Sequence, residues 1–288
     1  GMVSLLDATT HSINAAFVDL TTQLTNGASA SIKAAQDAGI PGVVGQAGWD
    51  QNIRIAMGTA EVAPIDNASG YSTLANNGTR IPWHTVKSVR DRSGAVAFNA
   101  NEQGTQSIEA NVAAGATQAL TEVAKSGTGR AVANLGYPVA GKTGTRYETD
   151  TKKTVSSWFV GYTKQITTAV NYVAGDSGNE DLDNYSAGFY GAGYPAHTWL
   201  YFMEKAMNGL PQQDFANYAP PTPLTTPTAV ITPTTTAPTV IVVPTATDTP
   251  TVTPTTPSAT STSTTTHTPT PTPTASHSVV PSPTPTGP

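Results

Sequence analysis

Residues 141–145 constrain the fold of this chain more than any other segment. They read Gly-Lys-Thr-Gly-Thr and come directly after the residues Tyr-Pro-Val-Ala. A lysine among glycines and threonines can hold an anion close to the backbone, because glycine lets a ligand approach the main chain and lysine supplies the charge. Such a segment occurs in a nucleotide-binding loop that opens onto a helix, or on a strand that lines an active site. The two alternatives require different folds.

The nucleotide-binding alternative depends on the residues after the lysine. Residues 136–143 match the pattern G-x-x-x-x-G-K-[ST]. In that class of site the loop leads into a helix whose first N–H groups face the phosphates. Here residues 145–154 are rich in threonine and carry no apolar helical stripe, and residues 155–160 have strand-like sequence. A nucleotide-binding loop therefore stays only as a remote alternative.

The hydrophobic pattern predicts helices first, then consecutive strands, then a closing helix. Helices are expected at 4–24 (with a possible break near 9–10), 29–38, 64–77, 108–125 and 196–207. A β-hairpin is expected at 85–98, and strands at 139–145, 154–163 and 166–174. This order is typical of an α+β fold, an antiparallel sheet with helices packed on it.

Composition changes near residue 211. Of the 23 prolines, five lie in residues 1–210 and the other eighteen lie in residues 211–288, interleaved with threonine, serine and valine. Proline lacks an N–H donor, and the segment has few large apolar side chains with which to build a core. We therefore predict one domain at 1–210 and a disordered Thr/Pro-rich tail at 211–288.

Charge and cysteine content narrow the possible partners and sites. The net charge is −5 and no run of lysine or arginine occurs, which disfavours nucleic acid as a partner. The absence of cysteine excludes a disulfide framework and a thiolate zinc site. No basic-then-apolar signal opens the chain. Because the first residues already read as helix, we expect an N-terminally truncated piece whose membrane anchor is missing.

Ser12, Ile13 and Asn14 form an S-x-N triplet in the first predicted helix. Acyl transfer from a peptide requires a nucleophile, a proton shuttle, an oxyanion hole and a cation for the substrate carboxylate. Ser12 can relay a proton, Asn14 can hold a substrate amide, and Lys142 can supply the cation. Alone, the triplet is common, and a helix whose polar face happens to carry serine and asparagine is the better explanation of it.

The segments around both motifs resemble those of class A penicillin-binding proteins, the bifunctional peptidoglycan transglycosylase/transpeptidases. The matching segments are 8–20, 57–64, 71–78, 127–129, 139–145, 158–162 and 193–203, in the order of the family. The resemblance covers residues 8–208, and the Thr/Pro tail is similar to that of actinobacterial members.

The resemblance implies the C-terminal portion of a transpeptidase domain with a β-lactamase/transpeptidase-like fold, its N-terminal part missing. That family cross-links cell-wall stem peptides through an acyl-enzyme formed on a D-Ala-D-Ala terminus, and β-lactams acylate the same serine. It works at the extracytoplasmic face of the bacterial membrane and needs no cofactor and no metal.

The resemblance also implies roles for individual residues. Ser12 corresponds to the proton-relay hydroxyl and Asn14 to the ligand of the substrate amide. Lys142 corresponds to the cation that stabilises the carboxylate and tunes Ser12, and the N–H of Thr145 to an oxyanion-hole donor. The expected substrate-binding residues are Thr143, Gly144 and Thr145.

The nucleophile of the family lies in an S-x-x-K motif upstream of S-x-N. No lysine of this chain has a serine three residues before it. We therefore expect the nucleophile to lie outside this chain and the chain alone to be inactive. The alternative is a non-catalytic module that binds the cell wall or penicillin.

Two further features have simpler explanations than a ligand site. Glu180, Asp181 and Asp183 are expected to form a solvated turn, since they lie among Gly, Asn and Asp residues. Trp158 falls at the centre of a predicted strand, where a core position is expected.

Overall fold

The computed structural model describes residues 1–42, 46–148 and 150–221. Its helices are α1 (Leu5–Thr10), α2 (Asn14–Gln23), α3 (Gly27–Ala38), α4 (Pro64–Ala75), α5 (Ala110–Lys125) and α6 (Tyr194–Ala206), with short 3₁₀ helices η1 (Ile53–Met57), η2 (Arg130–Leu135) and η3 (Leu182–Asn184). Its strands are β1 (Thr79–Arg80), β2 (Ser88–Arg90), β3 (Val96–Asn99), β4 (Thr105–Gln106), β5 (Ala140–Tyr147), β6 (Thr154–Tyr162) and β7 (Thr167–Tyr172). The predicted α+β class and the order of elements are confirmed.

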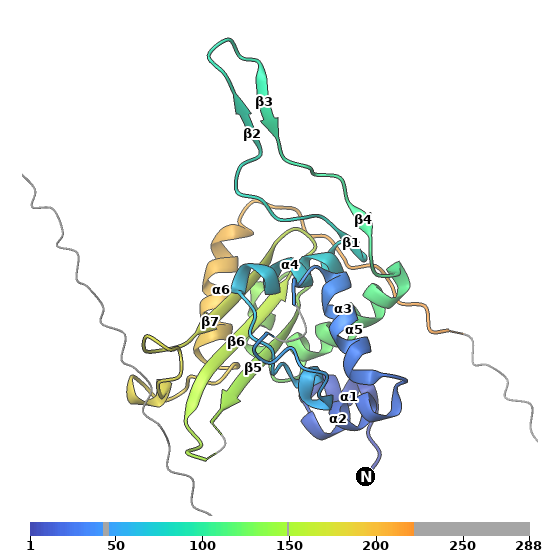
Figure 1. Cartoon of the computed structure of the whole chain (residues 1–288), viewed down its shortest axis with the longest axis vertical. Helices are drawn as coiled ribbons and strands as arrows, with labels where there is room; N and C mark the ends of the chain where they lie inside the picture. The colour runs from blue at the N-terminus through green and yellow to red at the C-terminus, as the bar shows by residue number, and fades with distance from the viewer. Residues whose placement is uncertain (43–45, 149, 222–288) are drawn as a thin grey trace, which may run out of the picture. The chain divides into compact units, whose positions relative to one another are not determined.

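An antiparallel sheet of order β5-β6-β7 forms the centre of the domain (Figure 1). Helices α4 and α5 pack on one side of it, and α6 packs on β6 and β7. Phe159 of β6 contacts the α6 side, whereas Tyr162 contacts α4 and α5, as expected for side chains that alternate along a strand. In the described part of the chain, the outer edge of β5 pairs with no further strand.

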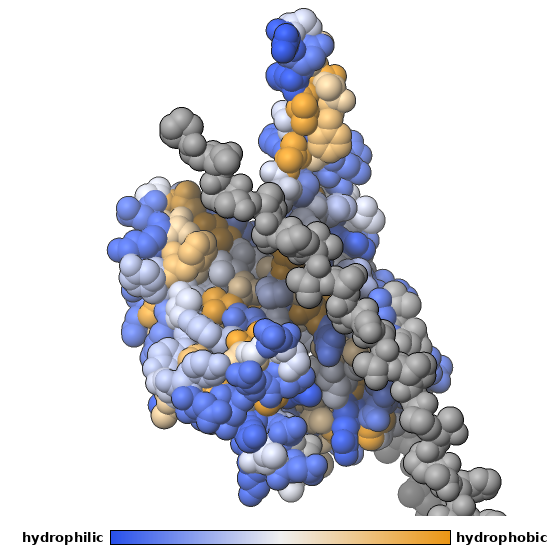
Figure 2. Space-filling view, turned by 60° about the vertical axis from the view of Figure 1, so that its left-hand side comes forward, coloured by the Kyte–Doolittle hydropathy of each residue, from blue (hydrophilic) through white to orange (hydrophobic). Residues whose placement is uncertain are grey.

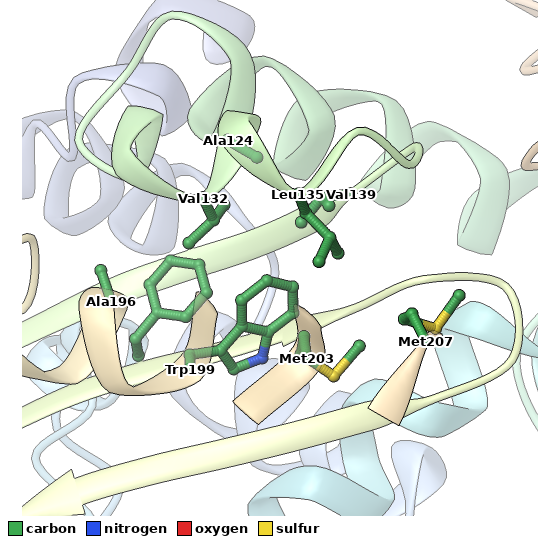
Figure 3. Close-up of a cluster of buried hydrophobic side chains, with 9 residues drawn as sticks. Ala124, Val132, Leu135, Val139, Ala196, Trp199, Met203 and Met207 are labelled. Atoms are coloured by element: carbon green, nitrogen blue, oxygen red, sulfur yellow. The ribbon is translucent and has the colours of Figure 1, made fainter. Parts of the chain in front are cut away.

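The larger apolar cluster lies between the sheet, η2 and α6, and Figure 3 shows its side chains. Trp199 of α6 is fully buried, and its ring packs edge-on against Phe159 with 5.3 Å between centroids. Its indole N–H donates to the carbonyl oxygens of Gly161 and Thr168, each at 3.1 Å. A large buried aromatic ring with a satisfied polar atom anchors α6 to the sheet.

The second face of the sheet is closed by α4 and α5. Tyr162 is fully buried there, and its hydroxyl shares a 2.9 Å hydrogen bond with Thr117 of α5. Ala140, the first residue of β5, and Ala75 of α4 belong to the same buried cluster. Lys142 lies two residues beyond Ala140 on the strand, so it shares this face of the sheet.

Residues just beyond the predicted domain boundary at 210 contact the domain. The ring of Phe215 packs on Tyr162 with 5.4 Å between centroids. Asn111, near the start of α5, exchanges hydrogen bonds of 2.8 and 2.9 Å with the backbone of Ala219. An aromatic side chain among the prolines keeps this stretch on the domain, because it buries apolar area that the composition as a whole does not suggest. The predicted disorder of the remaining tail concerns residues 222–288, which lie outside the described residues.

The predicted hairpin forms from β2 and β3 and projects from the domain (Figure 1). Val89 of β2 pairs with Phe98 of β3, and both side chains are exposed. Figure 2 shows apolar side chains gathered along this projection. At its base, β1 pairs with β4 over two residues each, a short ladder that the sequence pattern did not predict.

Candidate active site

Ser12 lies in the turn that ends α1 and leads into α2. The N–H of Ile13 donates to the carbonyl of Ala8 at 2.9 Å, and the N–H of Ser12 donates to that of Thr9 at 3.2 Å. These two bonds are those of a Schellman motif, in which the residue after the cap is left-handed. Ser12 has φ +56°. Glycine is the usual residue there, so a serine at this position indicates that its side chain has a use.

Lys142 and Ser12 meet, although 130 residues separate them in the sequence. The Lys142 Nζ donates to Ser12 Oγ at 2.6 Å and to the carbonyl of Thr143 at 3.0 Å. The contact arises because α1 packs on α5, and α5 packs on β5. Burial lowers the pKa of Lys142 to about 8, since desolvation disfavours the charged amine. The amine can thus exchange a proton with a neighbouring hydroxyl near neutral pH.

Thr143 and Thr145 lie on the other face of β5, because their partners Phe159 and Ser157 belong to the odd-numbered positions of β6. The hydroxyl of Thr145 accepts a 2.9 Å hydrogen bond from the N–H of Gly191, in the loop before α6. A Cβ at Gly191 would lie 2.7 Å from the carbonyl oxygens of Gly144 and Trp158. Only glycine lets this loop lie so close to the strand.

The remaining predicted residues lie close to this pair in the chain. Asn14 is the first residue of α2 and is exposed, and its side chain makes no hydrogen bond within the described residues. Gly144 pairs with Trp158, and a Cβ at Gly144 would lie 3.3 Å from the Cβ of Trp158. Trp158, expected in the core, is only half-buried, and its indole N–H donates to Ser156 Oγ at 2.9 Å.

A loop that sequence reasoning left without a role joins the two motifs. A Cβ at Gly127 would lie 2.2 Å from the carbonyl oxygen of Thr10, so the loop after α5 touches the end of α1. The next residue, Thr128, donates its N–H to that same carbonyl at 3.2 Å. Its hydroxyl lies 2.7 Å from the hydroxyl of Thr143. The Gly-Thr-Gly sequence at 127–129 is part of the family resemblance. Its contacts join residues far apart in the sequence, so no local pattern indicates them.

The remote nucleotide-binding alternative is not supported by the fold. Lys142 and Thr143 lie within β5, and the strand continues to Tyr147. In the described residues the next element after β5 is the strand β6, so no helix N-terminus supplies the converging N–H groups that would bind phosphates.

The acidic residues of the predicted turn lie away from Ser12 and Lys142. Asp183 accepts a 3.1 Å hydrogen bond from Thr154, and Glu180 accepts one of 3.0 Å from Tyr185. A groove of about 440 Å³ is lined by Ile65, Trp83 and Lys164, among others, and by none of the predicted site residues. Across the described ranges, no helix is both long and apolar enough to cross a bilayer.

Comparison with known proteins identifies the relatives of this chain. Residues 2–188 match the family model described as penicillin-binding protein transpeptidase domain. The chain is 33% identical over 228 residues to penicillin-binding protein 1A of Mycolicibacterium smegmatis, and 34% identical over 229 residues to that of Mycobacterium tuberculosis. Each alignment covers 75% of this chain but only 29% and 28% of the relative, so the chain spans less than a third of these proteins.

Solved structures agree with the sequence relatives. The penicillin-binding protein PonA1 from Mycobacterium tuberculosis superposes with a TM-score of 0.67 at 31% identity, covering 75% of this chain and 59% of that one. The same protein in complex with penicillin V gives a TM-score of 0.67 over 77% of this chain and 63% of that one. Penicillin-binding protein 1A from Haemophilus influenzae shares the fold, with a TM-score of 0.61 at 19% identity over 75% of this chain and 36% of that one. The chain thus belongs to the penicillin-binding protein transpeptidase family, as part of a class A transpeptidase domain.

Proposed function

We propose that this chain forms the carboxylate-binding and proton-relay side of a serine D,D-transpeptidase cleft. The substrates are cell-wall stem peptides that end in D-Ala-D-Ala, and β-lactams occupy the same place. The observation that carries the proposal is the 2.6 Å contact between Lys142 Nζ and Ser12 Oγ. The complete protein would act at the extracytoplasmic face of a bacterial membrane, where peptidoglycan is cross-linked.

The edge of β5 suits a ligand that ends in a carboxylate. Lys142 lies on one face of the strand, and the hydroxyls of Thr143 and Thr145 lie on the other. A ligand along the free edge is therefore within reach of a cation and two short hydroxyl side chains. An extended peptide can also pair with the unpaired backbone groups of such an edge, and the N–H of Thr145 would serve as an oxyanion-hole donor.

Ser12 and Lys142 provide the proton path. When a peptide bond is cleaved by acyl transfer, the leaving amine must gain a proton. Ser12 Oγ can pass a proton to that amine and recover one from the Lys142 amine that donates to it. A lysine pKa of about 8 permits this exchange near neutral pH, whereas an ordinary lysine would hold its proton too firmly. Asn14 is exposed two residues after Ser12, and we assign it the binding of the amide backbone of the substrate.

The acylated serine is expected on a segment outside this chain. All eight lysines lack a serine three residues before them, so no S-x-x-K motif is present. The chain alone would then bind the ligand without forming an acyl-enzyme. The same absence favours a second candidate function, a non-catalytic module that binds the cell wall or penicillin.

Fluorescent penicillin labelling with intact-mass detection separates these functions. The proteins to compare are the chain itself and the chain joined to the upstream transpeptidase segment of the Mycobacterium tuberculosis relative. We expect no covalent adduct on the chain and one adduct per molecule on the joined protein. In the joined protein, Lys142→Ala should abolish labelling, since it removes the carboxylate anchor.

The outcomes identify which part of the proposal fails. A stable adduct on the chain alone would show that it carries its own nucleophile. A joined protein that folds but takes no label would leave the non-catalytic module as the function. Unchanged labelling of the Lys142→Ala protein would remove lysine from its assigned role.

A further inference from the structure

We propose that Thr128 is a positioning residue, which orients the hydroxyl of Thr143 toward the ligand carboxylate and holds β5 against the Ser12 turn. The inference rests on the proposed function of the β5 edge. Thr128 lies in the loop between α5 and η2, which has no part in the proposed function as described above. The geometry of two hydrogen bonds made by Thr128 supports the inference.

Thr128 contacts both halves of the site at once. Its backbone N–H donates to the carbonyl of Thr10 at 3.2 Å, two residues before Ser12. Its side-chain hydroxyl lies 2.7 Å from that of Thr143 on β5. The loop can lie this close because Gly127 has no Cβ to clash with the carbonyl oxygen of Thr10. One residue therefore connects the turn that carries Ser12 to the strand that carries Lys142.

Thr143 is held from two sides. Its backbone carbonyl accepts a 3.0 Å hydrogen bond from Lys142 Nζ, and its side chain shares the 2.7 Å bond with Thr128. Lys142 in turn donates to Ser12. Thr143 thus links the two contacts, since its hydroxyl bonds to Thr128 and its carbonyl bonds to the cation that contacts the relay serine.

The direction of the hydroxyl bond decides whether Thr143 can bind a carboxylate. A threonine hydroxyl has one proton to donate, and a carboxylate only accepts. If Thr143 donates to Thr128, it has no proton left for a ligand. With a carboxylate bound, Thr143 must donate to the ligand, and Thr128 must donate to Thr143. A hydroxyl that accepts one hydrogen bond also becomes a better donor in the next. The hydrogen bond from Thr128 to Thr143 therefore strengthens the bond that Thr143 donates to the ligand carboxylate.

The test compares one pair of ligands across three variants of the whole chain. The ligands are diacetyl-Lys-D-Ala-D-Ala with a free carboxylate and the same tripeptide as a C-terminal amide, with affinity measured by calorimetry. Thr128→Val keeps the shape but removes the hydroxyl, and Thr128→Ser keeps the hydroxyl. Thr121→Val is the matched control, because the Thr121 hydroxyl is part-buried on α5 and donates to the carbonyl of Thr117 at 2.8 Å, apart from the site.

We expect the wild-type chain to prefer the carboxylate ligand to the amide. Thr128→Val should weaken carboxylate binding about fivefold, the usual effect of one net hydrogen bond, and leave amide binding unchanged. Thr128→Ser should restore carboxylate affinity to within about twofold of the wild type. Thr121→Val should change neither affinity.

Two results would overturn the inference. In the first, Thr128→Val keeps the full carboxylate preference of the wild type. In the second, it weakens both ligands equally and serine does not rescue, which is the behaviour of a residue that only supports the fold. If the wild-type chain itself shows no carboxylate preference, the proposed function of the β5 edge fails, and this result is distinct from the other two.

Discussion

The α6 core and the corner formed by Ser12 and Lys142 lie on opposite faces of the same sheet and differ in how their polar groups are stabilised. In the core, around Trp199 and Phe159, apolar groups are buried and the indole N–H is doubly partnered. In the corner, a serine occupies a left-handed position that suits glycine, and a lysine amine is desolvated until its pKa falls to about 8. The core raises the free energy of unfolding, whereas the corner lowers it because two polar groups are held in contact there. The comparison predicts opposite effects of substitution in the two regions.

Removing the central ring of the core should have the largest effect. Trp199→Ala leaves a cavity under α6 and two carbonyls without their donor, so we expect a loss of about 3–5 kcal/mol in the free energy of unfolding. Urea denaturation followed by circular dichroism measures it. Trp83→Ala is the control, because Trp83 is 51% exposed and should cost less than about 1 kcal/mol. Equal losses for the two variants would contradict the assignment of the core.

Replacing the lysine of the corner should act in the opposite direction. Below pH 8 the Lys142 amine is charged in both the folded and the unfolded chain. Burying this charge therefore lowers the free energy of unfolding by its full amount in that pH range. Lys142→Met should therefore raise the free energy of unfolding at pH 7 by roughly 1–3 kcal/mol. Between pH 8 and 10.5 the folded chain loses this proton before the unfolded chain, so wild-type stability rises and the advantage of methionine shrinks.

The control for this prediction is Lys87→Met, whose side chain is 77% exposed in the projecting hairpin. Its free energy of unfolding should equal that of the wild type at every pH between 7 and 10. Should Lys142→Met destabilise the chain at pH 7, the lysine would be a structural support and the comparison would fail.

The smallest effect is expected at the left-handed serine. Ser12→Gly removes a hydroxyl but suits φ +56°, so stability should stay within about 0.5 kcal/mol of the wild type or rise by up to about 1 kcal/mol. The pKa of Lys142 should shift, because the amine loses one acceptor. Thermal unfolding compared with Ser12→Ala, which loses the hydroxyl but keeps the unsuitable backbone, checks the reasoning. A glycine variant less stable than the alanine variant would contradict it.

The sequence predicted most of the fold because its signals were local. The expected helix at 108–125 matches α5, whose alanine-rich sequence ends at Ser126 and Gly127. The three strands after residue 139 match β5, β6 and β7 within a few residues. The break in the first helix was placed near residues 9–10, whereas the turn lies at 11–13. It was misplaced because the left-handed residue is Ser12, and no glycine marked it.

The site was predicted only in part, because contacts between distant residues leave no local signal. The family resemblance indicated Ser12 and Lys142, and the structure brings them together. It did not indicate that Thr128 joins α1 to β5, or that Gly191 bonds to Thr145. The proline count likewise did not indicate that Phe215, beyond the predicted boundary at 210, packs on Tyr162 of the sheet.

The most direct measurement of the central claim is the titration of the Lys142 amine by nitrogen NMR, with and without ligand. We predict a pKa near 8 in the free chain, because the amine is desolvated against Ser12. We also expect a rise in that pKa when the D-Ala-D-Ala carboxylate binds, and no rise with the C-terminal amide. A pKa near the ordinary value of 10.5, unchanged by either ligand, would contradict both the geometry of the corner and the function proposed for it.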